Sequence, residues 1–142
     1  MAWNVLVVDD HASVRRLLET VVGEDSRFDR VSTAEGIAQA LVVAERERPD
    51  VVLLDADLRG VDGLSAIGPL KERAPGAAVI VFSSAPYASD RTARAAGADR
   101  FVEKGTDLDV LLDVLVDAVA GLAQQRVVDL REPESAAVPD GL

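Results

Sequence analysis

Three aspartates stand directly after two apolar runs, where their carboxylates could together bind a cation. Asp9 and Asp10 follow the run Val5–Val8, and Asp55 follows the run Val51–Leu54. Short apolar runs bounded by turn-forming residues are typical of buried strands. Like charges at the ends of such strands raise the free energy of the folded chain unless a cation or a proton compensates them. The pattern therefore predicts an acidic pocket that holds a metal.

Magnesium suits this pocket, because Mg²⁺ prefers oxygen ligands and keeps several of its waters. Asp9, Asp10 and Asp55 are the expected carboxylate ligands, and the backbone carbonyl of Asp57 is the natural candidate for a further one. Asp55 could also be a nucleophile, because carboxylates can form aspartyl-phosphate intermediates. The sequence thus predicts a Mg²⁺ site, with Asp55 beside it as a candidate nucleophile.

Two more polar residues, Ser83 and Lys104, also stand at the ends of predicted strands. Transfer of a phosphoryl group to Asp55 would need charge compensation and positioning more than acid–base chemistry. Lys104 would supply a positive charge to a phosphoryl oxygen, and Ser83 would donate a hydrogen bond to another. The backbone N–H groups of Ala56 and Ser84 would complete the phosphate-binding site.

Apolar runs alternate with stretches of helical periodicity, and this alternation places the polar residues. Strands are expected over residues 5–8, 28–32, 51–54, 78–82 and 100–103. Helices are expected over residues 14–23, 37–48, 64–73 and 89–96, and from about 106 onward. Five strand–helix units predict a parallel sheet with helices on both faces. Right-handed crossovers bring the carboxyl ends of such strands to one edge, so the polar residues should converge there.

The third expected helix contains a local conflict at Gly68-Pro69. Proline inside a helix removes a backbone donor and clashes with the preceding turn. We therefore expect either a kink at this point or a late start of the helix.

Length and composition limit the other possibilities. At 142 residues, 49% apolar and 28% charged, the chain fits one globular domain over residues 1–121. Residues 122–142 are expected to extend the last helix and then to form a flexible tail or linker. The absence of cysteine excludes thiol chemistry and disulfides, and the single histidine, His11, excludes a multi-histidine metal site.

The net charge and the hydropathy predict a cytoplasmic protein. A formal charge of −10 argues against direct nucleic-acid binding by this chain and against docking on an anionic membrane. No apolar stretch reaches the roughly 20 residues of a membrane span. The N-terminus, Met1–Asn4, lacks the basic and apolar regions of a signal peptide.

With these residues placed, the chain resembles the receiver domains of two-component response regulators over about residues 3–121. The matching stretches are Val5–His11, Val51–Asp55, Asp62–Leu64, Val79–Ser84 and Gly97–Lys104. The resemblance implies an α/β, flavodoxin-like, doubly wound fold with a five-stranded parallel sheet of strand order 2-1-3-4-5 in a single domain.

The resemblance also implies roles for the pocket residues. Asp55 falls on the position phosphorylated by a partner sensor histidine kinase, and Asp9 and Asp10 fall on the acidic Mg²⁺ pair. Ser83 falls on the switch hydroxyl and Lys104 on the phosphate-binding lysine. Such a chain is a phospho-acceptor rather than an enzyme, although it could assist its own phosphorylation and dephosphorylation.

A switch and an output are implied as well. Phe101 falls on the aromatic switch residue, which follows Ser83 when phosphorylation repacks the face made by helix 4, strand 5 and helix 5. That face would control an output domain or partner protein. The Phe82-Ser83 ending is similar to receivers that precede helix-turn-helix DNA-binding domains, which implies transcription regulation. Apolar residues on more than one side of the last helix predict a homodimer contact through it.

Two positions depart from the family pattern. Gly105 stands where a proline commonly follows the lysine, and Arg59 replaces the proline usual four residues after the phospho-acceptor. We expect a changed backbone after Lys104, a more mobile loop after Asp55, and a positive charge from Arg59 near the pocket.

Three other functions compete with this interpretation. The run Val51–Asp57 also resembles the first motif of haloacid-dehalogenase-type phosphatases, but in those enzymes the acidic pair follows the nucleophile, whereas Asp9 and Asp10 precede Asp55. A flavin-binding electron carrier would need a glycine- and hydroxyl-rich phosphate loop where this chain is acidic. The third alternative is a receiver-like module that binds partners without phosphorylation.

Overall fold

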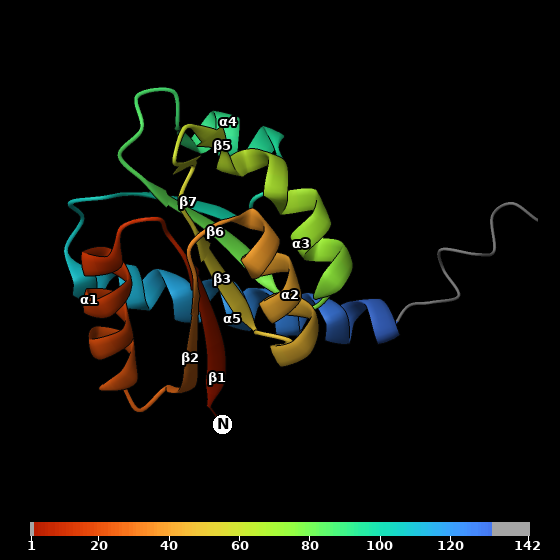
Figure 1. The fold of residues 1–142 in the computed structure, drawn as a ribbon. Helices are drawn as coiled ribbons and strands as arrows, with labels where there is room; N and C mark the ends of the chain where they lie inside the picture. The colour runs from red at the N-terminus through yellow and green to blue at the C-terminus, as the bar shows by residue number, and fades with distance from the viewer. Residues whose placement is uncertain (1, 132–142) are drawn as a thin grey trace, which may run out of the picture.

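A five-stranded parallel sheet forms the centre of the molecule, and helices cover both of its faces (Figure 1). The structure is a computed structural model that describes residues 2–131, so the tail expected beyond residue 131 lies outside the described residues. The strand order is β2-β1-β3-β6-β7, and every neighbouring pair is parallel. Counting the strands of this sheet alone gives 2-1-3-4-5, so the predicted fold is confirmed.

The strands of the main sheet are β1 (Trp3–Val8), β2 (Phe28–Ala34), β3 (Val51–Leu54), β6 (Ala78–Ser83) and β7 (Arg100–Glu103). The helices are α1 (Ala12–Gly23), α2 (Ile37–Glu47), α3 (Ile67–Arg73), α4 (Asp90–Ala95) and α5 (Leu108–Arg131). The predicted bounds of β3 and β7 are both correct. The last helix begins two residues later than expected and continues to Arg131.

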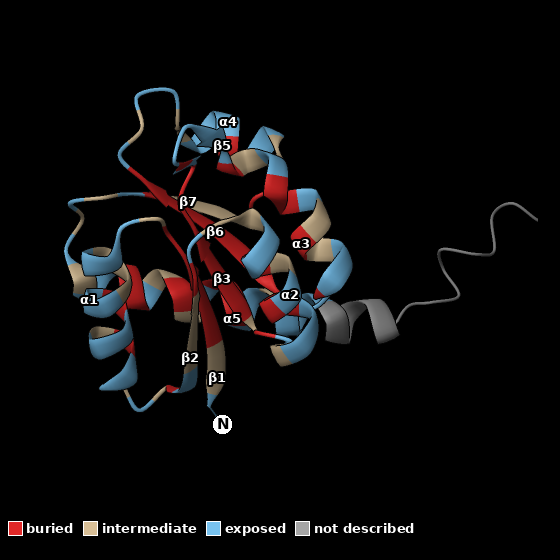
Figure 2. Ribbon diagram, in the orientation of Figure 1, coloured by how far each residue is buried: buried red, intermediate tan, exposed pale blue. Residues whose placement is uncertain are grey.

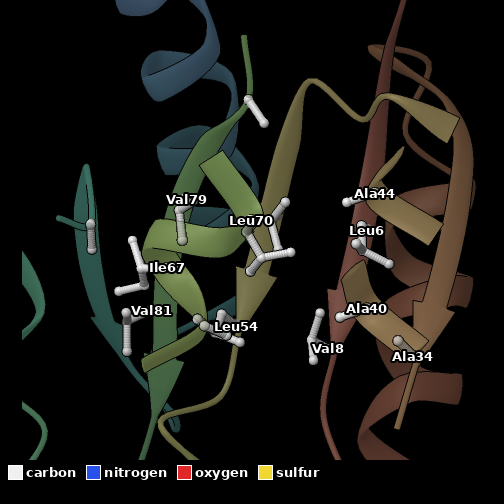
Figure 3. Packing of buried hydrophobic residues seen from close by; sticks show 14 of the residues in the cluster. Leu6, Val8, Ala34, Ala40, Ala44, Leu54, Ile67, Leu70, Val79 and Val81 are labelled. Carbon is white, nitrogen blue, oxygen red and sulfur yellow. The ribbon is translucent and has the colours of Figure 1, made fainter. Parts of the chain in front are cut away.

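Two apolar clusters lie on opposite faces of the sheet, and β1 contributes to both. Leu6 and Val8 belong to the cluster that includes residues of α2, α3 and α4, and Figure 3 labels its α2 and α3 members Ala40, Ala44, Ile67 and Leu70. Val5 and Val7 belong to the cluster that includes residues of α1 and α5. All four of these β1 side chains are at most 1% exposed. The central strands are buried on both faces (Figure 2), which explains their continuous apolar sequence. A strand held in this way gives the residues at its end a fixed position.

The conflict at Pro69 is resolved by a late start of the third helix. A 3₁₀ turn, η1 (Gly63–Ala66), comes first, and the α-helix begins only at Ile67. Pro69 therefore lies in the first turn of α3, where backbone N–H groups have no partner within the helix. The expectation of a kink or late start is confirmed in its second form.

The sequence analysis missed a small antiparallel ribbon, formed by β4 (Asp57–Leu58) and β5 (Val61–Asp62). The two residues between these strands, Arg59 and Gly60, both have positive φ, of 55° and 81°. A two-residue turn with positive φ at both positions matches the twist of an antiparallel pair. The segment after Asp55 is therefore a folded hairpin, and the Arg59-Gly60 pair was the available signal for it.

No helix in the described part of the chain combines the length and the apolar character that a membrane span requires.

Candidate functional site

The predicted pocket residues lie at the carboxyl ends of β1, β3, β6 and β7, and backbone hydrogen bonds hold those ends together. The N–H of Asp55 donates to the carbonyl of Val8, at 3.0 Å, and the N–H of Lys104 donates to the carbonyl of Ser83, at 3.1 Å. The N–H of Asp9 donates to the carbonyl of Ala34, at 3.1 Å. The strand ladder therefore brings together residues that are up to 95 positions apart, as the alternating pattern predicted.

Lys104 connects two buried carboxylates. Its Nζ lies 2.7 Å from Oδ2 of Asp9 and 2.9 Å from Oδ2 of Asp55. Asp9 is only 2% exposed and Asp55 only 4%. Burial alone would lower the pKa of Lys104, but the hydrogen bonds to the two carboxylates outweigh it and raise the pKa above the ordinary lysine value. Lys104 is therefore charged at neutral pH and compensates part of the acidic charge.

Ser83 holds the other oxygen of Asp55. Its hydroxyl, buried at 1% exposure, donates to Oδ1 of Asp55 at 2.9 Å. The N–H of Asp57 donates to the same oxygen at 3.1 Å. Both carboxylate oxygens of Asp55 thus face hydrogen-bond donors, which fix the orientation of the group.

Asp10 completes an acidic set that can hold a cation. Its Oδ1 is buried and accepts no hydrogen bond, a state that costs free energy unless a cation or water compensates it. Asp9, Asp10, His11 and Asp55 each offer one ligand atom, and these four atoms lie within 4.8 Å of one another. Three carboxylates against one lysine leave excess negative charge. The residues therefore fit a divalent cation that accepts oxygen ligands.

His11 is a member of this set that the sequence analysis left without a role. Its Nδ1 lies 3.1 Å from Oδ1 of Asp9 and 3.1 Å from Oδ1 of Asp10. Arg15 also approaches the pocket, through a 2.7 Å hydrogen bond from its guanidinium to the carbonyl of Asp9. The position of His11 directly after the acidic pair was the only sequence signal for its part in the set.

The two predicted backbone donors follow the pocket residues directly in sequence. Ala56 comes after Asp55 and is fully buried, and Ser84 comes after Ser83 and is exposed. The Ala56 carbonyl accepts hydrogen bonds from the Tyr87 hydroxyl, at 2.7 Å, and from the Gly63 N–H, at 2.6 Å. The contact with Tyr87 was not predicted, and it ties the loop after β6 to the loop after β3.

The remaining predicted positions lie around the pocket rather than in it. Phe101 is half-buried and packs against the cluster that includes Leu6 and Val8. Gly105 has a φ of 102°, which a proline could not adopt, so the backbone after Lys104 does differ as expected. Arg59 pairs with Glu35, at 3.3 Å, rather than with a pocket carboxylate. The expected charge near the pocket is thus neutralised by a neighbour.

Gly63 is required where the hairpin passes the pocket backbone. A methyl group on Gly63 would collide with the carbonyl oxygen of Asp55. Because the strand end cannot move freely, Gly63→Ala is expected to lower the free energy of unfolding by about 1–3 kcal/mol. Urea denaturation measures this change. Gly68→Ala is the control, since nothing lies within 4 Å of a methyl group there; equal stability of the two variants would contradict the assignment.

Known proteins match this chain over most of its length. A family model described as "Response regulator receiver domain" matches residues 5–116. The nitrate/nitrite response regulator protein NarL of Escherichia coli strain K12 is 30% identical over 119 residues, which cover 83% of this chain and 55% of NarL. The chain therefore spans about half the length of this curated relative.

Two solved structures are also similar. The REC domain of AraT, a response regulator from Geobacillus stearothermophilus, superposes with a TM-score of 0.74 at 27% identity and covers 89% of this chain and 99% of that one. A response regulator protein from Burkholderia pseudomallei, described with a phosphorylated aspartic acid, a calcium ion and citrate, has a TM-score of 0.72 at 25% identity. That match covers 89% of this chain and 74% of the other.

Proposed function

Because the chain belongs to the family of response regulator receiver domains, we propose that it is the phospho-acceptor part of a two-component system, phosphorylated on Asp55 by a partner sensor histidine kinase. The observation that carries this proposal is the setting of Asp55. Its carboxylate is buried and contacts the Lys104 ammonium on one oxygen and the Ser83 hydroxyl on the other.

The proposed reaction moves a phosphoryl group onto one carboxylate oxygen of Asp55. That oxygen forms a bond to phosphorus, while the bond between phosphorus and the kinase histidine nitrogen breaks and its electron pair stays on the nitrogen. Lys104 compensates the charge on a phosphoryl oxygen, and the hydroxyl of Ser83 donates to another. The N–H groups of Ala56 and Ser84 serve as further donors. Lys104 and Ser83 already contact Asp55 before the reaction, at 2.9 Å each.

Asp9, Asp10, Asp55 and the backbone carbonyl of Asp57 are the residues that we propose to hold Mg²⁺. When bound, Mg²⁺ would neutralise negative charge on the carboxylates and on the entering phosphoryl group. The buried Oδ1 of Asp10, which accepts no hydrogen bond, supports a direct contact of this residue with the ion.

We further propose that Ser83 and Phe101 transmit the phosphorylated state. Ser83 contacts Asp55, and its carbonyl accepts the N–H of Lys104, which follows β7 directly. Phe101 lies on β7 itself. A shift of Ser83 toward a phosphoryl oxygen would therefore change the packing beside Phe101 and the surface made by α4, β7 and α5.

We infer from NarL, a response regulator of which this chain covers about half, that an output domain or partner protein in transcription regulation binds that surface. Homodimerisation through α5 stays a prediction; Val110 on this helix is 49% exposed. Sedimentation with and without a phosphoryl analogue tests it, and a concentration-independent monomer in both states would contradict it.

The proposed function is tested by intact-mass analysis after incubation with acetyl phosphate. We expect one phosphoryl group per chain in the presence of Mg²⁺, and none when EDTA removes the metal. Peptide mapping should locate the group on Asp55. A stoichiometric adduct without continued release of phosphate distinguishes a phospho-acceptor from a phosphatase, and an unmodified chain would favour a module that acts by binding alone.

A further inference from the structure

The chain's single histidine, His11, stands at the start of a helix without capping it. His11 is the N-cap residue of α1, yet its side chain makes no hydrogen bond to the helix. The ring instead lies against the acidic pair, with Nδ1 at 3.1 Å from an oxygen of Asp9 and 3.1 Å from an oxygen of Asp10. The side chain is 62% exposed, so burial does not force it into this orientation.

Asp9 does not depend on the ring for a hydrogen bond. Its Oδ1 already accepts the backbone N–H of His11, at 2.9 Å, and the ring nitrogen adds a second contact to the same oxygen. Oδ1 of Asp10, at the same distance from the ring, accepts no hydrogen bond. Helix capping therefore does not explain the position of the imidazole, whose Nδ1 contacts one oxygen of each carboxylate.

We infer that His11 is a nitrogen ligand of the metal held by the acidic pocket, and that it shifts the preference of the site from Mg²⁺ toward first-row transition ions such as Mn²⁺. The inference rests on the metal site of the proposed function. Magnesium strongly prefers oxygen ligands, whereas imidazole suits transition ions, and carboxylates suit Mn²⁺ as well as Mg²⁺. One imidazole added to three carboxylates would thus favour a transition ion.

The distances agree with this role. Adjacent ligands of an octahedral ion with bonds of about 2.1 Å lie about 3.0 Å apart. The nitrogen of His11 lies 3.1 Å from each of two carboxylate oxygens, which is the separation of neighbouring ligands. All four ligand atoms, including that of Asp55, fall within 4.8 Å of one another. Ligation through Nδ1 requires the proton of the neutral ring to reside on Nε2.

Pulsed electron paramagnetic resonance of bound Mn²⁺ tests the ligand directly. The untagged chain contains one histidine, so any imidazole ¹⁴N coupled to Mn²⁺ belongs to His11. We expect this coupling in the wild-type chain and its loss in His11→Asn, which keeps a polar side chain but removes the imidazole. Absence of the coupling in wild-type protein with Mn²⁺ bound would overturn the inference.

Metal preference gives a second readout. The ratio of Mn²⁺ to Mg²⁺ affinity, measured by competition, is expected to fall roughly tenfold in His11→Asn, a loss at the lower end of that for groups supporting a metal site. Ser13→Ala, an exposed and uncharged neighbour in the first turn of α1, should keep the wild-type ratio. An unchanged ratio in His11→Asn would also overturn the inference.

The two proposals can fail separately. Uptake of a phosphoryl group with Mg²⁺, without ¹⁴N coupling to Mn²⁺, would overturn the role of His11 alone. Coupling to His11 in a chain that takes up no phosphoryl group with either ion would support the metal ligand and contradict phosphorylation.

Discussion

A chain with asparagine in place of Asp55 is expected to take up no phosphoryl group from acetyl phosphate, under conditions that modify the wild-type chain fully. The amide lacks the carboxylate oxygen that would attack phosphorus. It is nearly the same size, so the pocket should keep its shape. Intact-mass analysis with Mg²⁺ gives the result directly, and any adduct of wild-type extent in Asp55→Asn would place the phospho-acceptor elsewhere.

The stability of this variant separates loss of function from loss of structure. Asparagine weakens the bond to Lys104, but it also removes one of three like charges in the pocket. These effects oppose each other, so we expect the free energy of unfolding without metal to stay within about 1 kcal/mol of wild type. Asp29→Asn, which removes the same charge at an exposed position of β2, should keep both the adduct and the stability.

Replacing Lys104 by methionine is expected to lower the free energy of unfolding by about 3 kcal/mol in the absence of divalent metal. Lys104 is the shared partner of two buried carboxylates, and its own side chain is only 17% exposed. Removing one partner of a buried ion pair leaves the other charges uncompensated. Urea denaturation in EDTA measures the loss.

The chain offers a matched control in its other lysine. Lys71 pairs with Asp99 at 2.9 Å, but its side chain is 33% exposed and Asp99 also accepts the N–H of Val79. Lys71→Met should therefore cost no more than about 1 kcal/mol. Saturating Mg²⁺ should reduce the deficit of Lys104→Met, because the acidic set without the lysine charge should bind the cation more tightly and so gain more stability from it than wild type does. Equal losses in the two variants would contradict the shared role of Lys104.

The stability difference between wild type and Lys104→Met should depend on pH. The pKa of Lys104 is raised in the folded state by its hydrogen bonds to Asp9 and Asp55, despite the opposing effect of burial. Its contribution to stability is therefore fully present below the ordinary lysine pKa and is lost as the pH rises through the folded value. The difference in unfolding free energy between wild type and Lys104→Met should shrink in strongly alkaline solution.

The strands of the sheet could be predicted from the sequence, because a strand that is buried on both faces is a continuous apolar run. Runs such as Val51–Leu54 have no polar face, and the polar residue that follows marks the end of the strand. The convergence of Asp9, Asp55 and Lys104 then follows from parallel topology alone. The roles of these residues in phosphorylation remain predictions that the experiments above test.

Other features could not be read from periodicity. Strands of two residues, as in β4 and β5, are too short to show an alternating pattern. The contact between Tyr87 and the Ala56 carbonyl joins two loops whose relative position is set by the folded sheet. The ring of His11 takes its direction from a side-chain torsion, and a sequence does not record torsions. The neutralisation of Arg59 by Glu35 likewise depends on how the hairpin packs beside α2.

The pocket residues lie at strand ends, whereas exposed apolar residues lie on helices, and this separation affects how the sequence can change during evolution. The pocket side chains extend from strands that two apolar clusters hold in place. Exposed residues such as Leu17 and Val42 instead belong to the helices α1 and α2. Mutation can therefore alter those helix surfaces while the pocket carboxylates stay unchanged. Duplicated copies of one gene could in this way acquire different helix surfaces while they keep the same pocket residues.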